Sequence, residues 1–275
     1  MNRGVVVTDA ADHGYAVRWF VGVITATTKR ASTGPRPGSA GGRRPVEGRW
    51  PRRQVRDGDD GAAAWTSLMV LADRPGTANN LGAGVDEHWY GIDVGAGLPV
   101  ERIDPGVGDV FGFCGAAALL RTAAVRAVGG FPGEFFLYYE DLDTSWRLRL
   151  AGWSIRAVPA ARVVHRHAAT SDRRSELFHF HNERNRPLTL LRCAPSRVAA
   201  TQITRFTLTT GSLALAGALS RPIPDQQNFR VGLRLRVLAA VLRQLPGAVL
   251  RRQGTRAGRR AVASAAMART PAPVA

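Results

Sequence analysis

The chain is poor in lysine and in cysteine. Lys29 is the only lysine in the 275 residues, so arginine carries nearly all of the positive charge. Such a skew reflects a GC-rich coding sequence as readily as selection for phosphate binding, which weakens a nucleic-acid-binding interpretation. Cys114 and Cys193 are the only cysteines. Two thiols far apart in the sequence provide neither a disulfide framework nor the spacing of a metal site, so we expect both to be reduced.

Long hydrophobic runs are also absent. The best candidate for a membrane span, Phe206–Ser220, has 15 residues, is interrupted by threonine and serine, and is bounded by arginines. Crossing a bilayer takes roughly 20 apolar residues. The apolar run at residues 19–26 is too short for a secretory signal peptide. We therefore predict neither a transmembrane helix nor a signal peptide.

Acidic residues are nearly missing from the last part of the chain. Residues 196–275 carry 13 basic residues against one acid, a net charge of +12. Residues 66–195 carry 14 of each sign, and residues 1–65 carry 11 basic against 6 acidic residues. A balanced central segment is typical of a folded domain, whereas basic flanks favour polyanionic surfaces such as an anionic membrane.

These shifts in composition divide the chain into four parts. Residues 1–64 are rich in arginine, glycine and proline and cannot bury enough apolar surface to offset their ordering entropy, so we predict a disordered leader. We predict a folded α/β domain over residues 65–195 and a helical basic region over residues 196–262. Residues 263–275 are expected to form a disordered tail.

The central segment alternates between strand and helix patterns. Four stretches have the composition of buried strands: 67–72, 109–114, 153–158 and 161–165. Helices are predicted over residues 116–128 and 140–151, because apolar residues recur there at helical spacing and glycine follows each stretch. The glycine-rich stretch 76–108 predicts an ordered loop or an irregular hairpin. The alternation indicates an α/β layer structure.

The basic flank contains an amphipathic helix pattern. Its apolar residues fall in one stripe: Val231, Leu235, Leu238, Leu242, Leu245 and Val249. Its arginines are expected on or beside the other faces: Arg230, Arg234, Arg236, Arg243, Arg251 and Arg252. Pro246 is expected to kink the helix. Such a helix either lies on a membrane surface or packs on the folded domain with a solvated arginine face.

Three carboxylates follow an aromatic run and form the most informative feature of the chain. In residues 131–146, bulky apolar side chains lead into Glu140, Asp141 and Asp143 at the start of a predicted helix. Burial against the apolar wall would raise a carboxylate pKa, and the helix N-terminus would lower it. A carboxylate ionised near neutrality can accept a proton from a substrate hydroxyl. The alternative is a set of helix-favouring acids in a first turn, which we favour less because no lysine or run of arginines precedes them.

Histidines and arginines supply further candidates. His165 and His167 lie two residues apart at the end of a predicted strand, and a hydrolase metal site built on them with the histidine pair at positions 179 and 181 is the less favoured alternative. A single histidine, His165, is the better candidate for a metal ligand or a partner for a leaving phosphate. Arg184 and Arg186 fit either bidentate phosphate binding or a solvated helix face.

Six collinear stretches together resemble family 2 glycosyltransferases, specifically the rhamnosyltransferase-like branch with a GT-A fold. They are Phe-Cys-Gly-Ala-Ala-Ala-Leu-Leu-Arg (113–121), Val-Gly-Gly-Phe (128–131), Phe-Phe-Leu-Tyr-Tyr-Glu-Asp-Leu-Asp (135–143), Arg-Leu-Arg-Leu-Ala-Gly-Trp (147–153), Val-Val-His-Arg-His (163–167) and Asn-Glu-Arg-Asn-Arg (182–186). Their order and spacing agree with the family over about residues 66–195. The resemblance implies an incomplete GT-A-like mixed sheet with flanking helices, followed by C-terminal basic amphipathic helices.

The resemblance implies an inverting, hexosyltransferase-type enzyme that moves a sugar from a nucleotide-diphosphate donor to a glycan or lipid-linked acceptor. By position, Asp141 would be the general base with Glu140 beside it, and His165 would be a metal ligand near the diphosphate, for Mg²⁺ or Mn²⁺. The remaining positions would line the acceptor side (Cys114, Gly115 and Ala116) or close on the donor phosphates (Arg184 and Asn185). The expected location is cytoplasmic, peripheral to the inner face of the bacterial plasma membrane through the basic helix, with no nucleic-acid partner.

The sequence departs from the family before residue 66. The family's nucleotide-binding half normally precedes the matched region, but residues 1–65 show no βαβ pattern that could hold a nucleotide. We therefore expect the acceptor-side half of a truncated enzyme, with residues 1–60 out of frame and the donor site incomplete. The alternative hypothesis is a non-enzymatic basic protein that binds membranes or nucleic acid through its flanks.

Overall fold

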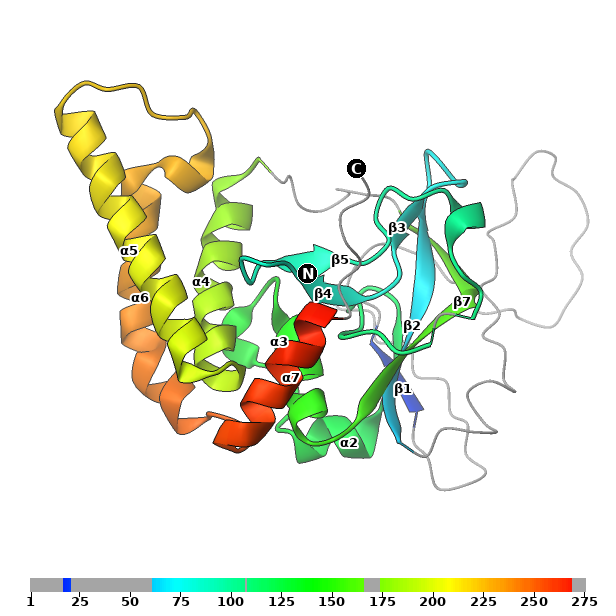
Figure 1. The fold of residues 1–275 in the computed structure, drawn as a ribbon. Coiled ribbons are helices and arrows are strands. Elements are labelled where there is room, and N and C mark those ends of the chain that lie inside the picture. The colour runs from blue at the N-terminus through cyan, green and yellow to red at the C-terminus, as the bar shows by residue number, and fades with distance from the viewer. Residues whose placement is uncertain (1–16, 21–60, 107, 166–173, 269–275) are drawn as a thin grey trace, which may run out of the picture.

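The computed structural model describes residues 17–20, 61–106, 108–165 and 174–268. Figure 1 shows a mixed sheet on one side of the molecule and a layer of long helices on the other, with a hairpin and further helices between them. The α/β class and the mixed sheet with flanking helices expected from the sequence are confirmed.

The centre of the sheet is β2 (Ala62–Leu71), in which every residue is buried. One edge of β2 pairs in parallel with β7 (Ser154–His165) over nearly its whole length. The other edge is shared by two antiparallel partners, β6 (Ala118–Arg121) and β3 (Ala78–Asn80). Beyond β6 lies β1 (Val17–Phe20). Because β2 is covered on both edges, it is the rigid element on which the neighbouring loops are built.

The two strands predicted on either side of Pro159 are one strand, β7. The register against β2 shifts where Val158 pairs with Ser67 and Arg162 pairs with Leu68, so residues 159–161 bulge out of the ladder. Proline has no backbone N–H to donate, and a bulge is a position in a sheet where none is required. The proline interrupts the pairing without ending the strand.

The helix predicted over residues 116–128 is wrong in its first half. Residues 118–121 form β6, and only α2 (Thr122–Ala127) is helical. Alanine and leucine have high helix propensity, but here Ala118 and Leu120 fill the buried edge of β2, and tertiary packing outweighs propensity. The predicted stop at the following glycines is confirmed, since Gly129 and Gly130 have φ of 90° and 70°.

The segment predicted as a strand over residues 109–114 makes only isolated bridges. Asp109 bridges to Arg156 of β7, and Gly112 bridges to Ala83. Ala83 belongs to an antiparallel hairpin of β4 (Ala83–Val85) and β5 (Gly91–Asp93), as the glycine-rich stretch predicted. The segment crosses from the sheet to the hairpin instead of following either one, which explains why it is extended but unpaired along its length.

The helix predicted over residues 140–151 is confirmed as α3 (Glu140–Leu150). Its Trp146 is fully buried, with its ring stacked on Trp89 at 6.0 Å and in edge contact with Phe111 at 5.3 Å. α3 also packs against α7 (Arg256–Ala268), where Ala263 and Ala266 are buried. Helical structure therefore runs past the boundary expected at residue 262, and β2 begins before the boundary expected at residue 65.

Three long helices form the outer layer: α4 (Glu176–Cys193), α5 (Ser196–Ala218) and α6 (Val231–Leu250), which lie side by side in Figure 1. Single 3₁₀ turns complete the fold: η1 (Val100–Arg102), η2 (Gly133–Phe135) and η3 (Gln227–Phe229). Within the described ranges, every helix is too short or too polar to span a bilayer.

α6 has two apolar faces. The face that packs on α4 and α5 carries Leu233, Val237 and Val241, whereas the predicted stripe is partly or largely exposed, with Leu235 and Leu242 the clearest cases. The side chain of Arg234, expected on a solvated face, is buried. Its guanidinium donates to Thr210 Oγ1 at 2.9 Å and to the carbonyl oxygen of Phe206 at 2.9 Å. Arg234 joins α6 to α5 because a buried guanidinium needs fixed acceptors.

Candidate active site

Asp141 lies at the N-terminal end of α3 and faces a turn that follows the sheet. Its Oδ2 accepts a hydrogen bond from the backbone N–H of Gly115 at 2.9 Å, and its Oδ1 accepts one from the N–H of Leu142 at 2.7 Å. The side chain is therefore fixed in orientation from two sides. Each carboxylate oxygen keeps lone-pair capacity for a further donor.

The turn at Cys114–Ala117 is attached to β2. The N–H of Cys114 donates to Thr66 Oγ1 at 3.2 Å, and the N–H of Ser67 donates to the carbonyl oxygen of Ala117 at 3.1 Å. Gly115 lies so close to the acid that an added Cβ would sit 3.3 Å from Asp141 Cβ. The structure thus brings the predicted acceptor-side turn and the predicted base into contact, and glycine is the residue that permits this approach.

Glu140 lies beside Asp141 in a different electrostatic setting. Its Oε2 is buried and has no hydrogen-bond partner among the described residues. Burial, and then the negative charge of Asp141, raise the pKa of Glu140 to about 7. Burial also raises the pKa of Asp141, while the N–H groups of Gly115 and Leu142 oppose that shift. The two acids therefore influence each other: one carboxylate is held by two backbone N–H groups, and the other keeps an oxygen without a partner among the described residues.

Two polar residues of this region were not singled out from the sequence. Asp93 of β5 adds a negative charge that further raises the pKa of Asp141. The side chain of Asn80 holds the Asp93 carboxylate in place, because Asn80 Nδ2 donates to Asp93 Oδ1 at 2.6 Å. Asn80 is itself fixed, since its Oδ1 accepts a hydrogen bond from the N–H of Gly82 at 2.6 Å. The available signal was the pair of asparagines inside a buried stretch between Ala78 and Leu81, since buried amides need partners.

The turn that leads into the acids has an unusual backbone. Phe136, Tyr138 and Tyr139 have φ of 61°, 64° and 67°. Residues other than glycine adopt positive φ at a cost of order 1–3 kcal/mol each. Tyr139 is anchored where its hydroxyl oxygen accepts the N–H of Gly91 at 2.8 Å. Such a turn persists only because its surroundings hold it.

α4 supplies that support through two adjacent residues. Asn185 is fully buried, and its Nδ2 lies within hydrogen-bond distance of three carbonyl oxygens of the turn, those of Phe135 (3.1 Å), Leu137 (2.8 Å) and Tyr138 (2.8 Å). Arg184 donates from Nη2 to the carbonyl oxygen of Phe135 at 2.8 Å. Both residues lie behind the turn, which makes them positioning groups for the acids. Their expected contact with donor phosphates stays a prediction.

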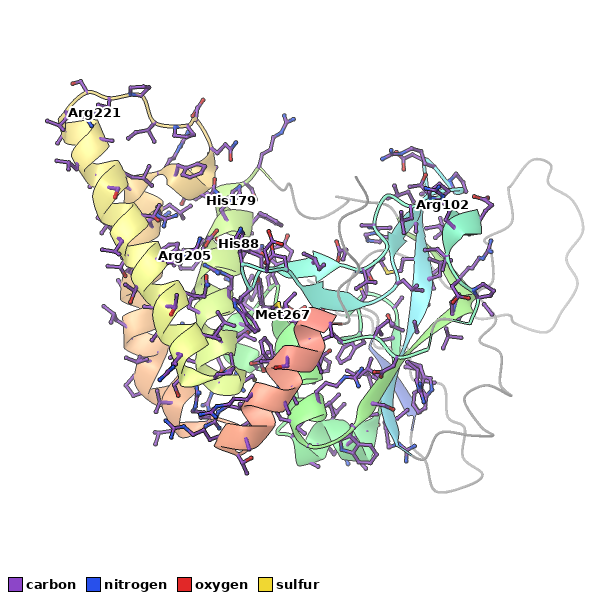
Figure 2. All side chains as sticks on the ribbon, in the orientation of Figure 1. His88, Arg102, His179, Arg205, Arg221 and Met267 are labelled. Atoms are coloured by element: carbon purple, nitrogen blue, oxygen red, sulfur yellow. The ribbon has the colours of Figure 1, made fainter. Side chains whose placement is uncertain are left out.

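The alternative of a solvated arginine face on α4 is wrong. The residues Arg184 and Arg186 are only 7% and 4% exposed. Arg186 donates to Gln202 Oε1 at 3.0 Å and to the carbonyl oxygen of His88 at 3.2 Å. Figure 2 shows His88 beside α4. These cations tie the hairpin and α5 to α4.

Asp143 has a different role from its two neighbours. It is fully buried, with Oδ1 2.7 Å from Arg147 Nε and Oδ2 3.5 Å from Arg192 Nε. The sequence offered no cationic partner before the acids, but these partners follow them. The side chain of Asp143 is committed to this ion-pair cluster.

The described residues do not fit a metal centre. No three of their histidine, cysteine, aspartate and glutamate side chains gather as a possible ligand set. Nδ1 of His165 lies 2.5 Å from Asn79 Oδ1 at the end of β7. His181 instead packs against Phe136, with ring centroids 5.4 Å apart, and His167 lies outside the described residues. The expected metal-ligand role of His165 stays a prediction.

Comparison with known proteins agrees with this site. Residues 102–187, which hold the turn, both acids and the supporting part of α4, match the model of glycosyl transferase family group 2. Over this segment the chain is similar to family 2 glycosyltransferases, and the resemblance inferred from the six motifs is confirmed. The partial mixed sheet with flanking helices is consistent with a GT-A-like domain.

The curated relatives that the chain matches are named as rhamnosyltransferases. The chain is 32% identical over 157 residues to the N-acetylglucosaminyl-diphospho-decaprenol L-rhamnosyltransferase of Mycobacterium tuberculosis, in strains CDC 1551 / Oshkosh and ATCC 25618 / H37Rv. The match covers 57% of this chain and 46% of each relative, so it spans about half of their length. These matches favour the enzyme hypothesis over a non-enzymatic basic binder.

Proposed function

We propose that the chain acts in glycosyl transfer, as a family 2-like, inverting hexosyltransferase that moves a sugar from a nucleotide-diphosphate donor to a glycan or lipid-linked acceptor. The observation that carries the proposal is the contact between Asp141 and Gly115, with Glu140 beside it. It joins a fixed proton acceptor to the turn at Cys114–Ala117.

The proton transfer follows from this geometry. An acceptor hydroxyl bound over the turn at Cys114, Gly115 and Ala116 donates a hydrogen bond to Asp141. As the hydroxyl oxygen bonds to the anomeric carbon, its proton moves to the carboxylate, and the bond to the nucleoside diphosphate breaks with its electron pair on the leaving group. Attack opposite the leaving group inverts the anomeric centre. The backbone N–H groups on Asp141 keep the carboxylate aimed throughout, and such positioning accounts for a large part of catalysis.

Glu140 tunes this acceptor. With one carboxylate ionised, the second is hard to ionise, so the pair holds a single proton near neutrality. Once Asp141 has taken the proton of the acceptor, the charge that raised the pKa of Glu140 is gone. Glu140 is then free to ionise and to return the site to its starting charge.

A divalent metal, Mg²⁺ or Mn²⁺, remains part of the proposal as the group that neutralises a leaving diphosphate. The described residues offer no ligand set for it, so no step above depends on it. Arg184 and Asn185 are proposed to hold the turn that carries the acids and to contact the donor phosphates.

The substrates are proposed from the relatives. The name of these relatives specifies L-rhamnose as the transferred sugar and N-acetylglucosaminyl-diphospho-decaprenol as the acceptor. We propose the same classes for this chain: a nucleotide-diphosphate deoxyhexose as donor and a sugar linked through a diphosphate to a prenol as acceptor, in cell-wall polysaccharide assembly.

A lipid-linked acceptor places the enzyme at the inner face of the bacterial plasma membrane, which we propose as its location. The support is the outer face of α6, where Leu235, Leu242 and Val249 are at least half exposed at seven-residue spacing beside Arg236 and Arg243. Apolar side chains flanked by arginines suit an anionic lipid surface. Sedimentation with anionic vesicles should fall for Leu242→Glu, and equal sedimentation with neutral vesicles would contradict the proposal.

The rate of sugar transfer by the Asp141→Asn variant, compared with wild type, tests the proposed function. We expect wild-type protein to transfer L-rhamnose from its nucleotide diphosphate to a short-chain N-acetylglucosaminyl-diphospho-prenol, followed by chromatography of the product. Asp141→Asn should reduce the rate by about 10³-fold or more, because general-base catalysis and the charge of the pair are lost together. The matched control is Asp73→Asn, which changes an acid with a 74% exposed side chain on the surface.

Two results would overturn the proposal. One is transfer by Asp141→Asn at the wild-type rate. The other is wild-type protein that neither transfers sugar nor binds any nucleotide-diphosphate sugar in calorimetric titration with and without manganese.

A further inference from the structure

A groove lies between α4 and α6, apart from the acid pair. Its main part has a volume of about 640 Å³, which is in the range of small-molecule sites. Its lining comes from both helices: Glu176, Leu177, Phe180, His181, Arg236, Ala239, Ala240 and Arg243. A second hollow of about 400 Å³ continues it past Glu176 and Arg236 toward Arg230. None of these residues has a part in the proton transfer described above.

The groove is apolar along one wall and cationic along its rim. Leu177 and Phe180 of α4 form the apolar wall, and the small side chains of Ala239 and Ala240 leave the floor open. Arg236 and Arg243 stand seven residues apart on one face of α6, about 10 Å along the axis. Arg236 is paired with Glu176, whereas Arg243 has no ion-pair partner among the described residues. The lining therefore has an excess of positive charge beside an apolar surface.

The ring of His181 lines the groove beside Phe180. His181 is only 7% exposed, and its Nδ1 is shielded from solvent, so this residue meets the groove through the rest of its ring. His181 is therefore a wall of the groove and leaves the ligand's charge to the arginines.

The same histidine connects the groove to the acids. The ring of His181 lies 5.4 Å from the ring of Phe136, which is 62% exposed in the turn ahead of Glu140. One helical turn further along α4, Arg184 binds the carbonyl oxygen of Phe135 in that turn. A long ligand in the groove would thus have one end at the turn that carries the catalytic carboxylates.

We propose that the groove between α4 and α6 binds the lipid diphosphate part of the acceptor, an anionic amphiphile of the prenyl diphosphate class, and presents the attached sugar past Phe136 to the acid pair. This inference rests on the proposed function for the identity of the attached sugar. The apolar wall leaves a bare inorganic anion incompletely bound, and the arginines disfavour a neutral lipid. Arg243 and Arg236 bind the diphosphate as charge-assisted donors, and the prenyl chain lies along Leu177, Phe180 and the alanine floor.

Binding of farnesyl diphosphate to the full chain, kept below its micellar concentration and followed by calorimetry, tests the proposal. We expect it to bind at least about tenfold more tightly than inorganic diphosphate or farnesol, since each lacks half of the contacts. Arg243→Gln should weaken binding about 10- to 100-fold, as expected for a lost charge-assisted hydrogen bond. Ala239→Phe, which fills the open floor at an exposed position, should weaken it at least about tenfold.

Matched controls come from α5, which contributes nothing to the groove lining. Arg205→Gln and Arg221→Gln remove exposed arginines of α5 and of the turn after it, both labelled in Figure 2, and Ala214→Phe adds the same bulk at an exposed alanine. Binding by all three should stay within about twofold of wild type, below the effect of one weak hydrogen bond.

Three outcomes would overturn the proposal: wild-type affinity in both Arg243→Gln and Ala239→Phe, equal affinity for inorganic diphosphate, or equal losses in the α5 controls, which would indicate general electrostatic attraction. The test is separable from the proposed function. Asp141→Asn should bind farnesyl diphosphate as tightly as wild type does. Loss of sugar transfer would therefore not contradict binding in the groove, and absence of binding in the groove would not contradict the role of Asp141 as the base.

Discussion

Glu140, Asp141 and Asp143 share one turn of α3 but meet different surroundings. We call Asp143 with its arginines the structural side of this turn, and Glu140 with Asp141 the reactive side. Asp143 is enclosed by Arg147 and Arg192 and is fully buried. No described arginine pairs with the other two; Asp141 is held by backbone N–H groups, and Glu140 has an oxygen without a partner. Two of three adjacent acids are left reactive, while the third holds the helix in place.

The ion-pair cluster around Asp143 explains why this arrangement is stable. Arg147 also donates to the carbonyl oxygen of Gly130 at 2.7 Å and to that of Val128, which ties α3 to the end of α2. Arg192 reaches Glu134 at 3.3 Å from the end of α4. The structural side of α3 thus fixes the helix against its neighbours, and the reactive side can keep groups that would otherwise be destabilising.

The largest effect on stability is expected from breaking the structural side. Asp143→Ala leaves Arg147 and Arg192 buried without their carboxylate and should cost about 3–5 kcal/mol of unfolding free energy. Urea denaturation followed by tryptophan fluorescence measures this loss. Asp141→Asn is the matched comparison from the reactive side and should change stability by less than about 1 kcal/mol. Equal losses in the two variants would show that the two sides of the turn do not differ in this way.

An intermediate effect is expected from the support behind the reactive side. Asn185→Ala removes the amide that bonds three carbonyl oxygens of a turn with three positive φ values, and should cost about 2–3 kcal/mol. The rate of sugar transfer per folded molecule should also fall about 10²-fold, because a loosened turn misplaces the acids. Asn182→Ala is the control, since its Nδ2 donates only within α4, to the carbonyl oxygen of Phe178 at 2.9 Å. A transfer rate in Asn185→Ala equal to that of the control would remove the positioning role.

The smallest effect is expected from Glu140→Gln, and it depends on pH. The folded state raises the pKa of Glu140 from 4.5 to about 7, so the unfolded chain releases its proton first as the pH rises. Wild-type stability should therefore fall between about pH 4.5 and pH 7, and this loss persists at higher pH. Glutamine has no such penalty, so the variant should be more stable than wild type by about 1–3 kcal/mol at pH 8.

At pH 4, where Glu140 is protonated in both states, the difference should vanish. Urea denaturation at the two pH values measures it. A Glu140→Gln variant no more stable than wild type at pH 8 would mean that the carboxylate finds a partner in solution and is not the reactive group inferred here.

Much of the site was readable from the sequence, because its chemistry lies in short contiguous motifs. The aromatic run into Glu140 and Asp141 predicted acids at a helix N-terminus, and α3 begins at Glu140. Cys114 and Gly115 were assigned to the same site through family resemblance. The contact of Gly115 with Asp141 required the sheet, since 26 residues separate them.

The errors share one cause. Residues 118–121 were read as helix from their alanine and leucine content, Arg234 was expected on or beside the polar faces of its helix, and Arg184 was left between phosphate binding and a solvated face. Each misreading followed intrinsic preference, whereas the folded chain placed these residues against partners distant in sequence: the edge of β2, the turn at Phe135 and the carbonyl of Phe206.

The sequence by itself determined the α/β class, the start of α3, the basic character of the C-terminal helices and the resemblance to family 2 glycosyltransferases, because periodicity, charge and contiguous motifs are local properties. Only the tertiary structure decided which of three neighbouring acids is neutralised by arginine, which arginines are buried, and that α4 and α6 leave a cationic groove between them. Those outcomes depend on burial and on pairing across the fold, and one stretch of sequence does not specify the dielectric surroundings or the partners that another stretch will bring.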